Sequence, residues 1–191
     1  MSTLTVTHVT PEEYLAAERL SETRSEYIDG GVYPTTGATL NHTVIVFSIG
    51  AELTPQLRSS PCRVVGIDLK FRLPDSRKFF YPDVTVVCGE PQFHDDRKDI
   101  ILNPVLVVEV LSKSTEAFDR GAKFEAYRTI ESLKEYLLVA QDRPFIEQFV
   151  RNDAGKWEYA SAIGPESSLT LPSIGCTLNL GAVYDKVDFN S

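Results

Sequence analysis

Three acidic residues lie within or beside apolar segments of this 191-residue sequence. Glu109 interrupts the apolar run LVVEVL, Asp83 precedes the run VTVV, and Asp68 lies in the alternating segment VGIDLKFRL. An ionised carboxylate in a buried strand destabilises the fold unless it pairs with a cation or binds a metal. A salt bridge would account for each acid taken alone. On neighbouring strands, the three could instead converge and supply the oxygen ligands that Mg²⁺ or Mn²⁺ prefers.

The hydrophobic pattern predicts the helices that would flank such strands. Thr10 begins a capping box, Asn41 can cap a second helix, and Ser114 or Thr115 can cap a third. The three predicted helices extend over about residues 10–20, 41–58 and 114–130. Four-residue spacing predicts the inner stripe of the third helix: Phe118, Ala122, Ala126 and Ile130.

Strand patterns account for most of the remaining sequence. They predict a hairpin over 24–35, strands over 62–73, 79–88, 104–112 and 135–140, and a second hairpin over 145–163. Pro82 lacks an amide donor and should mark the entry or the edge of its strand. After the second hairpin we expect little besides one short apolar run at 168–171. This order favours an α/β fold with a central mixed sheet flanked by helices, in a single domain over residues 1–191.

Composition excludes several classes of protein. Hydrophobic residues make up 42% and charged residues 24% of the chain, as in ordinary globular proteins. No transmembrane helix is expected, because no apolar run reaches a spanning length. The N-terminus lacks the pattern of a secretory signal. Three widely spaced cysteines argue against a disulfide framework or a CxxC metal site and fit a reducing cytoplasm.

The charge distribution gives mixed indications about a nucleic-acid partner. The formal net charge of −8 argues against binding through bulk charge. Residues 56–78, however, contain six basic and two acidic residues, a net charge of +4. This segment could form a positive face on an acidic protein, or it could simply be a charged strand edge.

The pattern of Pro82-Asp83 followed by Glu109-Val110-Leu111 on the next predicted strand resembles the PD-(D/E)XK nuclease signature. Within that superfamily, residues 10–185 resemble the Uma-type family of restriction-endonuclease-like proteins. The stretches that carry the likeness are SEYIDGGVY, NHTV, PDVTVV, PVLVVEVLSKSTEAFDRGAKFEAYR and SLKEYLLV. The resemblance implies a restriction-endonuclease-like core of order αβββαβ with an added hairpin. It also implies Mg²⁺-dependent phosphodiesterase chemistry on DNA, and a homodimer.

The chain departs from the superfamily signature at one position. The signature has a lysine two residues after the glutamate, where this chain has Leu111, which cannot donate to phosphate. The Uma-type pattern instead offers a lysine on the following helix, and this matches Lys123. Asp119, Lys123 and Tyr127 are spaced by four and share one helix face. An ordinary surface Asp–Lys pair beside a half-buried tyrosine would explain the same spacing, and the chain would then be an inactive relative.

Two further residues are singled out by their positions. Glu26 lies in SEYIDG, which matches a family segment whose glutamate can face the metal site. A solvated acid beside a hairpin is the alternative. His42 follows the expected helix cap, where a neutral capping or packing histidine is expected.

Together these residues predict hydrolysis of a phosphodiester. Asp83 and Glu109 would hold one or two Mg²⁺ ions, for which Mn²⁺ can substitute, with the Val110 carbonyl as a further ligand. Lys123 would direct positive charge toward the attacking water or the phosphate. Asp83 and Glu109 should then lie on adjacent strands, with carboxylates within about 5 Å of each other.

Two alternatives to this function remain open. The first is a non-catalytic module that keeps the nuclease fold to bind nucleic acid or protein, favoured by Leu111 and the net charge of −8. The second is a glycosidase that uses paired carboxylates, although nothing in the sequence marks a sugar-stacking cleft.

Overall fold

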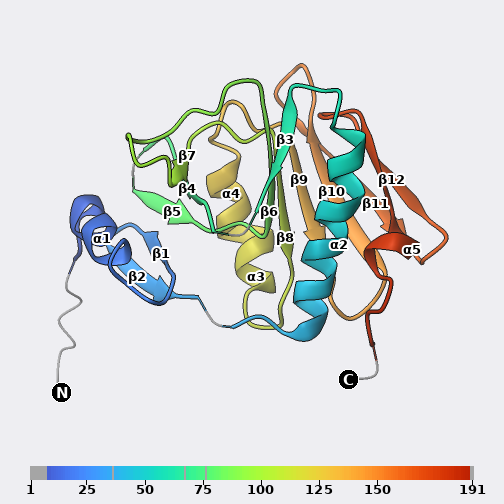
Figure 1. Ribbon diagram of the computed structural model, residues 1–191, viewed down its shortest axis with the longest axis horizontal. Helices are drawn as coiled ribbons and strands as arrows, with labels where there is room; N and C mark the ends of the chain where they lie inside the picture. Colours follow the sequence, from blue (N-terminus) through green and yellow to red (C-terminus); the bar gives the residue numbers. More distant parts are fainter. Residues whose placement is uncertain (1–7, 36, 67, 76, 190–191) are drawn as a thin grey trace.

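A six-stranded mixed sheet forms the centre of the computed structural model, which describes residues 8–35, 37–66, 68–75 and 77–189 (Figure 1). Its strand order is β11-β10-β9-β8-β6-β3. Strands β8 and β9 are parallel, and the other neighbours are antiparallel. The strands are β3 (Cys62–Val65), β6 (Val84–Cys88), β8 (Leu106–Val110), β9 (Glu135–Val139), β10 (Phe145–Arg151) and β11 (Trp157–Ile163).

Two smaller sheets lie beside the large one. The five-stranded sheet has the order β2-β1-β5-β4-β7, and β12 pairs with β13 in the third. Their strands are β1 (Ser25–Ile28), β2 (Gly31–Pro34), β4 (Lys70–Arg72), β5 (Lys78–Phe80), β7 (Ile100–Ile101), β12 (Ser168–Leu171) and β13 (Cys176–Asn179). The hairpins predicted over 24–35 and 145–163 are therefore present as β1–β2 and β10–β11.

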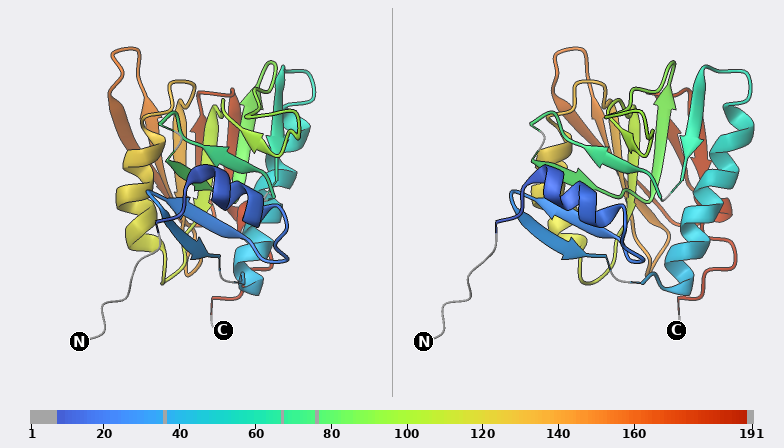
Figure 2. Two further views of the ribbon diagram at one scale, coloured as in Figure 1. Left: turned by 90° about the vertical axis from the view of Figure 1, so that its left-hand side faces the viewer. Right: turned by 60° about the vertical axis from the view of Figure 1, so that its left-hand side comes forward.

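Helices cover both faces of the large sheet, as Figure 2 shows for α2 and α4. They are α1 (Pro11–Glu18), α2 (Leu40–Gln56), α3 (Glu116–Phe118), the π-helical turn η1 (Asp119–Lys123), α4 (Phe124–Tyr127) and α5 (Leu180–Val183). Val108 and Val110 of β8 pack with Ile45 on the α2 side, whereas Val107 packs with Tyr127 on the α4 side. Since side chains alternate along a strand, Glu109 belongs to the α4 side. No described helix is long and apolar enough to cross a membrane.

The first two helices begin at threonines. Thr10 forms the predicted capping box with Glu13, and α1 ends at Glu18, slightly before the predicted end. The predicted cap of α2 at Asn41 is wrong. Thr39 has extended backbone and accepts the His42 N–H at 3.1 Å, while Asn41 lies inside the helix. The cap side chain must precede the helix to reach its free amides, and Thr39 does so.

Two predicted long strands are each divided. The segment 62–73 forms β3 and β4, which belong to different sheets, and residue 67 within it lies outside the described residues. The segment 79–88 forms β5 and β6, separated at Pro82. Proline at the entry of β6 fits its missing amide, because the chain crosses there from the small sheet to the large one. The alternating pattern predicted the faces of these strands but not the change of sheet.

The helix predicted over 114–130 differs from the expected one. A π-helical turn interrupts it over Asp119–Lys123, and the expected inner residue Ala122 is exposed. Ala126 and Ile130 are buried as predicted, and Asp119, Lys123 and Tyr127 are buried beside them. Such turns are frequent at functional sites.

The C-terminal segment contributes more structure than its sequence indicated. Besides the predicted run at β12, the chain forms β13 and α5. Cys176, Leu178 and Val183 from these elements are buried in the core on the α2 side of the sheet. Short elements of four residues give too few periodic positions to be recognised.

The spacing of the three cysteines argued against a disulfide framework, but one pair is bonded in the structure. The antiparallel register places Cys62 of β3 opposite Cys88 of β6, and the two form a disulfide. Cys176 is free and buried. Residues far apart in sequence become neighbours once two strands pair, so sequence spacing did not exclude this bond.

We expect the disulfide to stabilise the fold measurably. It closes a loop with a sequence separation of 26, for which the chain-entropy model gives about 3.5 kcal/mol. Dithiothreitol should therefore lower the urea midpoint of the wild type, and the variant with Cys62→Ser and Cys88→Ser should match the reduced protein. The same reductant applied to the double variant is the control and should change nothing. An unchanged midpoint in reduced wild type would contradict the bond's contribution.

Candidate active site

Asp83 and Glu109 lie at one end of two paired strands. In the antiparallel register Val84 faces Val108, so the next pair outward is Asp83 and Glu109. Asp83 Oδ2 accepts the backbone N–H of Val110 at 2.7 Å, and Oδ1 lies 3.1 Å from His42 Nε2. Asp83 thus joins β6 to both β8 and α2.

Glu109 is buried and interacts with the helical segment that follows β8. Its Oε1 accepts the hydroxyl of Tyr127 at 2.9 Å and lies 2.9 Å from Lys123 Nζ. The side chain of Glu109 is only 5% exposed, so this carboxylate depends on protein partners rather than on water.

The ammonium of Lys123 is the centre of the cluster. It lies 3.1 Å from Glu26 Oε1 and 3.6 Å from Asp119 Oδ1, in addition to its contact with Glu109. It also lies 5.5 Å from the centre of the Phe80 ring. Three carboxylates from β1, β8 and η1 therefore surround one buried cation. The alternative of an ordinary surface pair between Asp119 and Lys123 is wrong, because both side chains are buried.

The excess of negative charge sets the protonation of these groups. Burial lowers the pKa of Lys123, but the carboxylates of Glu109, Glu26 and Asp119 outweigh it and raise the pKa above its usual value. Burial raises the pKa of Glu109, and Asp119, Asp83 and Glu26 raise it further, while Lys123 opposes them. Lys123 is therefore charged at neutral pH, and the cluster favours any added positive charge.

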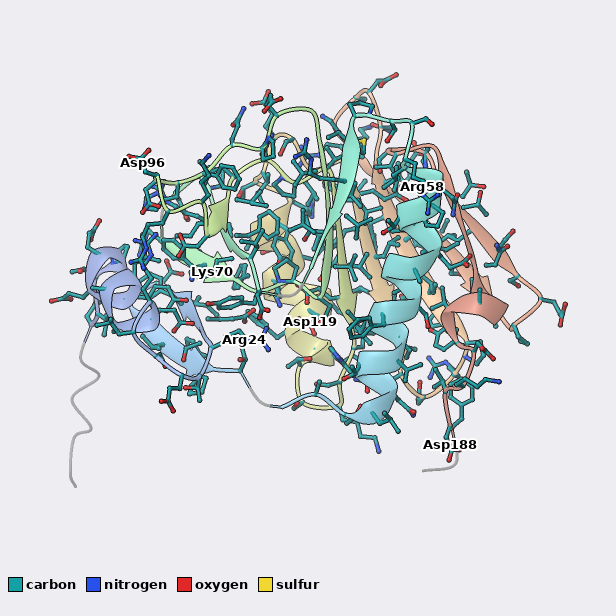
Figure 3. The ribbon with its side chains drawn as sticks, in the orientation of Figure 1. Arg24, Arg58, Lys70, Asp96, Asp119 and Asp188 are labelled. Atoms are coloured by element: carbon teal, nitrogen blue, oxygen red, sulfur yellow. A yellow bond between two sulfur atoms is a disulfide. The ribbon has the colours of Figure 1, made fainter. Side chains whose placement is uncertain are left out.

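Asp119 is the first residue of the π-helical turn, and Lys123 is the last. Both side chains are buried, and the Tyr136 hydroxyl of β9 donates to the Asp119 carbonyl at 3.1 Å. In Figure 3 Asp119 lies in the interior of the molecule, between the β1–β2 hairpin and α2. Burial is the main reason that the pKa of Asp119 is raised.

A second buried network, which the sequence did not indicate, supports Glu26. The Tyr81 N–H donates to Glu26 Oε1 at 3.2 Å, and the Tyr81 hydroxyl donates to Glu18 at 2.8 Å. Lys70, itself buried, donates to the Tyr81 hydroxyl at 3.2 Å and lies 3.6 Å from Asp99. Glu18 and Lys70 come from an ordinary helix and an alternating strand, so neither pattern marked them as buried partners.

Asp68 does not join the other acids. Its side chain is 84% exposed and pairs with Arg24 at 3.1 Å. The expected convergence of three acids is wrong for this residue, because the predicted strand that contained it changes sheet between β3 and β4.

The basic segment 56–78 is partly neutralised by acids from elsewhere in the chain. Lys70 pairs with Asp99, whereas Arg77 and Lys78 both pair with Asp29. Its sequence charge of +4 therefore overstates the positive charge that these side chains present.

The family of the chain is decided by comparison with known proteins. Residues 11–181 match the model of the Uma2 family, which is described as "Putative restriction endonuclease". The chain belongs to the Uma2 family. The match confirms the predicted resemblance.

Two relatives align with most of the chain, and a solved structure shares its fold. The Uma2 chain is 36% identical to slr1290 of Synechocystis sp. over 183 residues, which cover 95% of the chain and 94% of the relative. It is 33% identical to sll1609 of the same organism over 161 residues, or 84% and 91% of the two chains. A crystal structure from Anabaena variabilis, described as "a putative nuclease belonging to DUF820", shares 16% identity with a TM-score of 0.74. The alignment covers 93% of the Uma2 chain and 98% of the other, and it confirms the predicted mixed α/β fold.

The oxygen donors of the Uma2 site fit a hard divalent cation. Asp83 Oδ2 accepts one hydrogen bond and Oδ1 has one close nitrogen neighbour, His42 Nε2, which leaves lone pairs on both oxygens for a metal. Among the described residues, the buried hydroxyl of Thr85 has no hydrogen-bond partner, and its place two residues after Asp83 puts it on the same sheet face as Glu109. The described part of the chain contains no group of three His, Cys, Asp or Glu side chains arranged to hold a metal ion. The predicted ligand set contains only two such side chains, the carboxylates of Asp83 and Glu109, and its third ligand is the backbone carbonyl of Val110.

Solvent reaches this site at Asp83. The Asp83 side chain is 18% exposed, compared with 6% for Lys123. Asp83 also lines a groove of about 490 Å³ between α2 and β3, together with Phe47 and Val64. Among the residues of the site, Asp83 is the one that lines this groove, which lies on the α2 side of the sheet.

Proposed function

We propose that this Uma2 protein is a Mg²⁺-dependent endonuclease that hydrolyses phosphodiester bonds in DNA. The observation that carries the proposal is the convergence of Glu109, Glu26 and Lys123 in a buried cluster next to Asp83. Membership of a family described as "Putative restriction endonuclease" supports the same chemistry. We also propose that the protein acts as a single-domain homodimer, as expected from the superfamily, and that it works in the cytoplasm. The Cys62–Cys88 disulfide removes the support that the cysteine spacing gave to this location.

Asp83, Glu109 and the Val110 carbonyl would hold the metal. When bound, Mg²⁺ would lower the pKa of a bound water and stabilise the charge on the scissile phosphate. Tyr127 fixes the orientation of Glu109 through its hydroxyl at 2.9 Å. A phosphate oxygen could replace one carboxylate partner of Lys123. The ammonium would then stabilise the negative charge on that oxygen, and this stabilisation is strongest where little water is present.

One observation favours the alternative of a non-catalytic module. Lys123 already neutralises part of the charge of Glu109 and Glu26, so the cluster is stable without any metal. In that case the fold would bind nucleic acid or protein without hydrolysis. A measurement of metal binding distinguishes this module from the endonuclease.

We expect Mn²⁺ to raise the melting temperature of the wild type. A ligand that binds only the folded state stabilises it by about 2.7 kcal/mol at one hundred times its Kd. Asp83→Ala should abolish the shift in differential scanning fluorimetry, because it removes a proposed ligand. Asp68→Ala is the matched control, since Asp68 is exposed and pairs with Arg24 away from the site. Equal shifts in the wild type and Asp83→Ala would exclude this metal site.

A further inference from the structure

We propose that His42 is a positioning residue that holds Asp83 in the orientation required to bind the metal. The inference rests on the proposed function, because it assigns a task relative to the proposed ligand. It differs from the capping or packing role expected for this histidine.

The side chains of His42 and Asp83 are in close contact. His42 Nε2 lies 3.1 Å from Asp83 Oδ1, and because a carboxylate only accepts hydrogen bonds, the imidazole can interact with it favourably only through an N–H. The Val110 N–H donates to the other oxygen, Oδ2, at 2.7 Å. The two nitrogens approach different oxygens from different elements, so together they restrict the rotation of the carboxylate. Both side chains are 18% exposed, which shields the bond from water but leaves Asp83 accessible.

The turn that carries His42 is itself fixed to the end of β8. Thr39 Oγ1 accepts the His42 N–H at 3.1 Å and donates to Gln141 Oε1 at 2.7 Å. Gln141 Nε2 donates in turn to the carbonyl of Leu111 at 2.6 Å. The first turn of α2 is therefore tied to the strand that carries Glu109. His42 cannot shift relative to β8 without breaking these bonds.

Such an arrangement has a known effect on metal sites. Groups that orient a ligand through a hydrogen bond typically change metal affinity by about 10- to 100-fold when they are removed. The effect arises because a carboxylate that rotates freely must lose that freedom when the metal binds. His42 and Val110 impose the orientation in advance.

Mn²⁺ titration by isothermal calorimetry tests this role. We expect His42→Ala to raise the Kd for Mn²⁺ by about 10- to 100-fold. His42→Gln should restore most of the affinity, because its amide Nε2 can donate from nearly the same place, and rescue by a donor is not expected from packing alone. Thr43→Ala is the control, since its hydroxyl bonds the Thr39 carbonyl in the same turn. Circular dichroism at the titration temperature establishes that each variant is folded.

The outcomes separate this inference from the proposed function. Wild-type affinity in His42→Ala, with the wild type binding Mn²⁺, would overturn the positioning role and leave the metal site intact. A His42→Gln variant as weak as His42→Ala would also overturn it, because donation to Asp83 would then not be the cause. A wild type that binds no Mn²⁺ would overturn the proposed metal site, and the role of His42 with it.

Discussion

Lys123→Met should reduce Mg²⁺-dependent nicking of supercoiled plasmid DNA by about 10²- to 10³-fold, the usual cost of removing one preorganised electrostatic group. Methionine keeps the apolar stem of the side chain but removes the ammonium that lies 2.9 Å from Glu109. Lysine is not a metal ligand, so the Mn²⁺ thermal shift should persist. It should even increase, because the metal no longer competes with the ammonium for Glu109.

The activity measurement needs a control for general effects of charge on DNA binding. Lys156→Met removes an exposed lysine from the turn between β10 and β11 and should nick at the wild-type rate. Lys123→Met at full rate would show that the ammonium only balances the neighbouring acids. If the wild type nicks no substrate with any metal, the non-catalytic module becomes the better interpretation.

Lys123→Met should also lower the free energy of unfolding by about 3–5 kcal/mol at neutral pH. This is the usual cost when one partner of a buried ion pair is removed, because the groups left behind are buried without their cation and must stay unpaired or take up protons. Here the remaining groups are the carboxylates of Glu109, Glu26 and Asp119. Adding Glu109→Gln to Lys123→Met should recover much of the lost stability, because it removes one unpaired charge. Urea denaturation of the wild type, the two single variants and the double variant measures the coupling energy between Lys123 and Glu109.

The pH dependence of this deficit follows from the raised pKa of Glu109 and Asp119. A carboxyl group whose pKa is higher in the folded state favours folding when protonated, and this contribution is lost as the pH rises through its folded-state pKa. The difference between Lys123→Met and the wild type should therefore shrink as the pH falls toward about 4, near the reference carboxyl pKa values. A deficit that stays constant from neutral to acidic pH would show that packing, and not unpaired charge, causes the instability.

Local patterns in the sequence predicted much of what the site contains. Asp83 and Glu109 were recognised because each is an acid next to an apolar strand, and strand periodicity fixes which neighbours share a face. The spacing of Asp119, Lys123 and Tyr127 indicated one common face, and all three are buried on the same side of the sheet. These features depend only on residues close together in sequence, and the periodicity of one element is enough to predict them.

The tertiary structure alone decided which of these residues meet. Glu26 contacts Lys123 because the β1–β2 hairpin lies beside the large sheet, and His42 contacts Asp83 because α2 begins at Thr39 next to the end of β8. Cys62 meets Cys88 through strand register, whereas Asp68 leaves the site because its strand changes sheet. Such contacts depend on register, on breaks between strands and on the packing of distant elements. A period of two or of 3.6 residues specifies faces within one element, and it carries no information about which other element each face will contact.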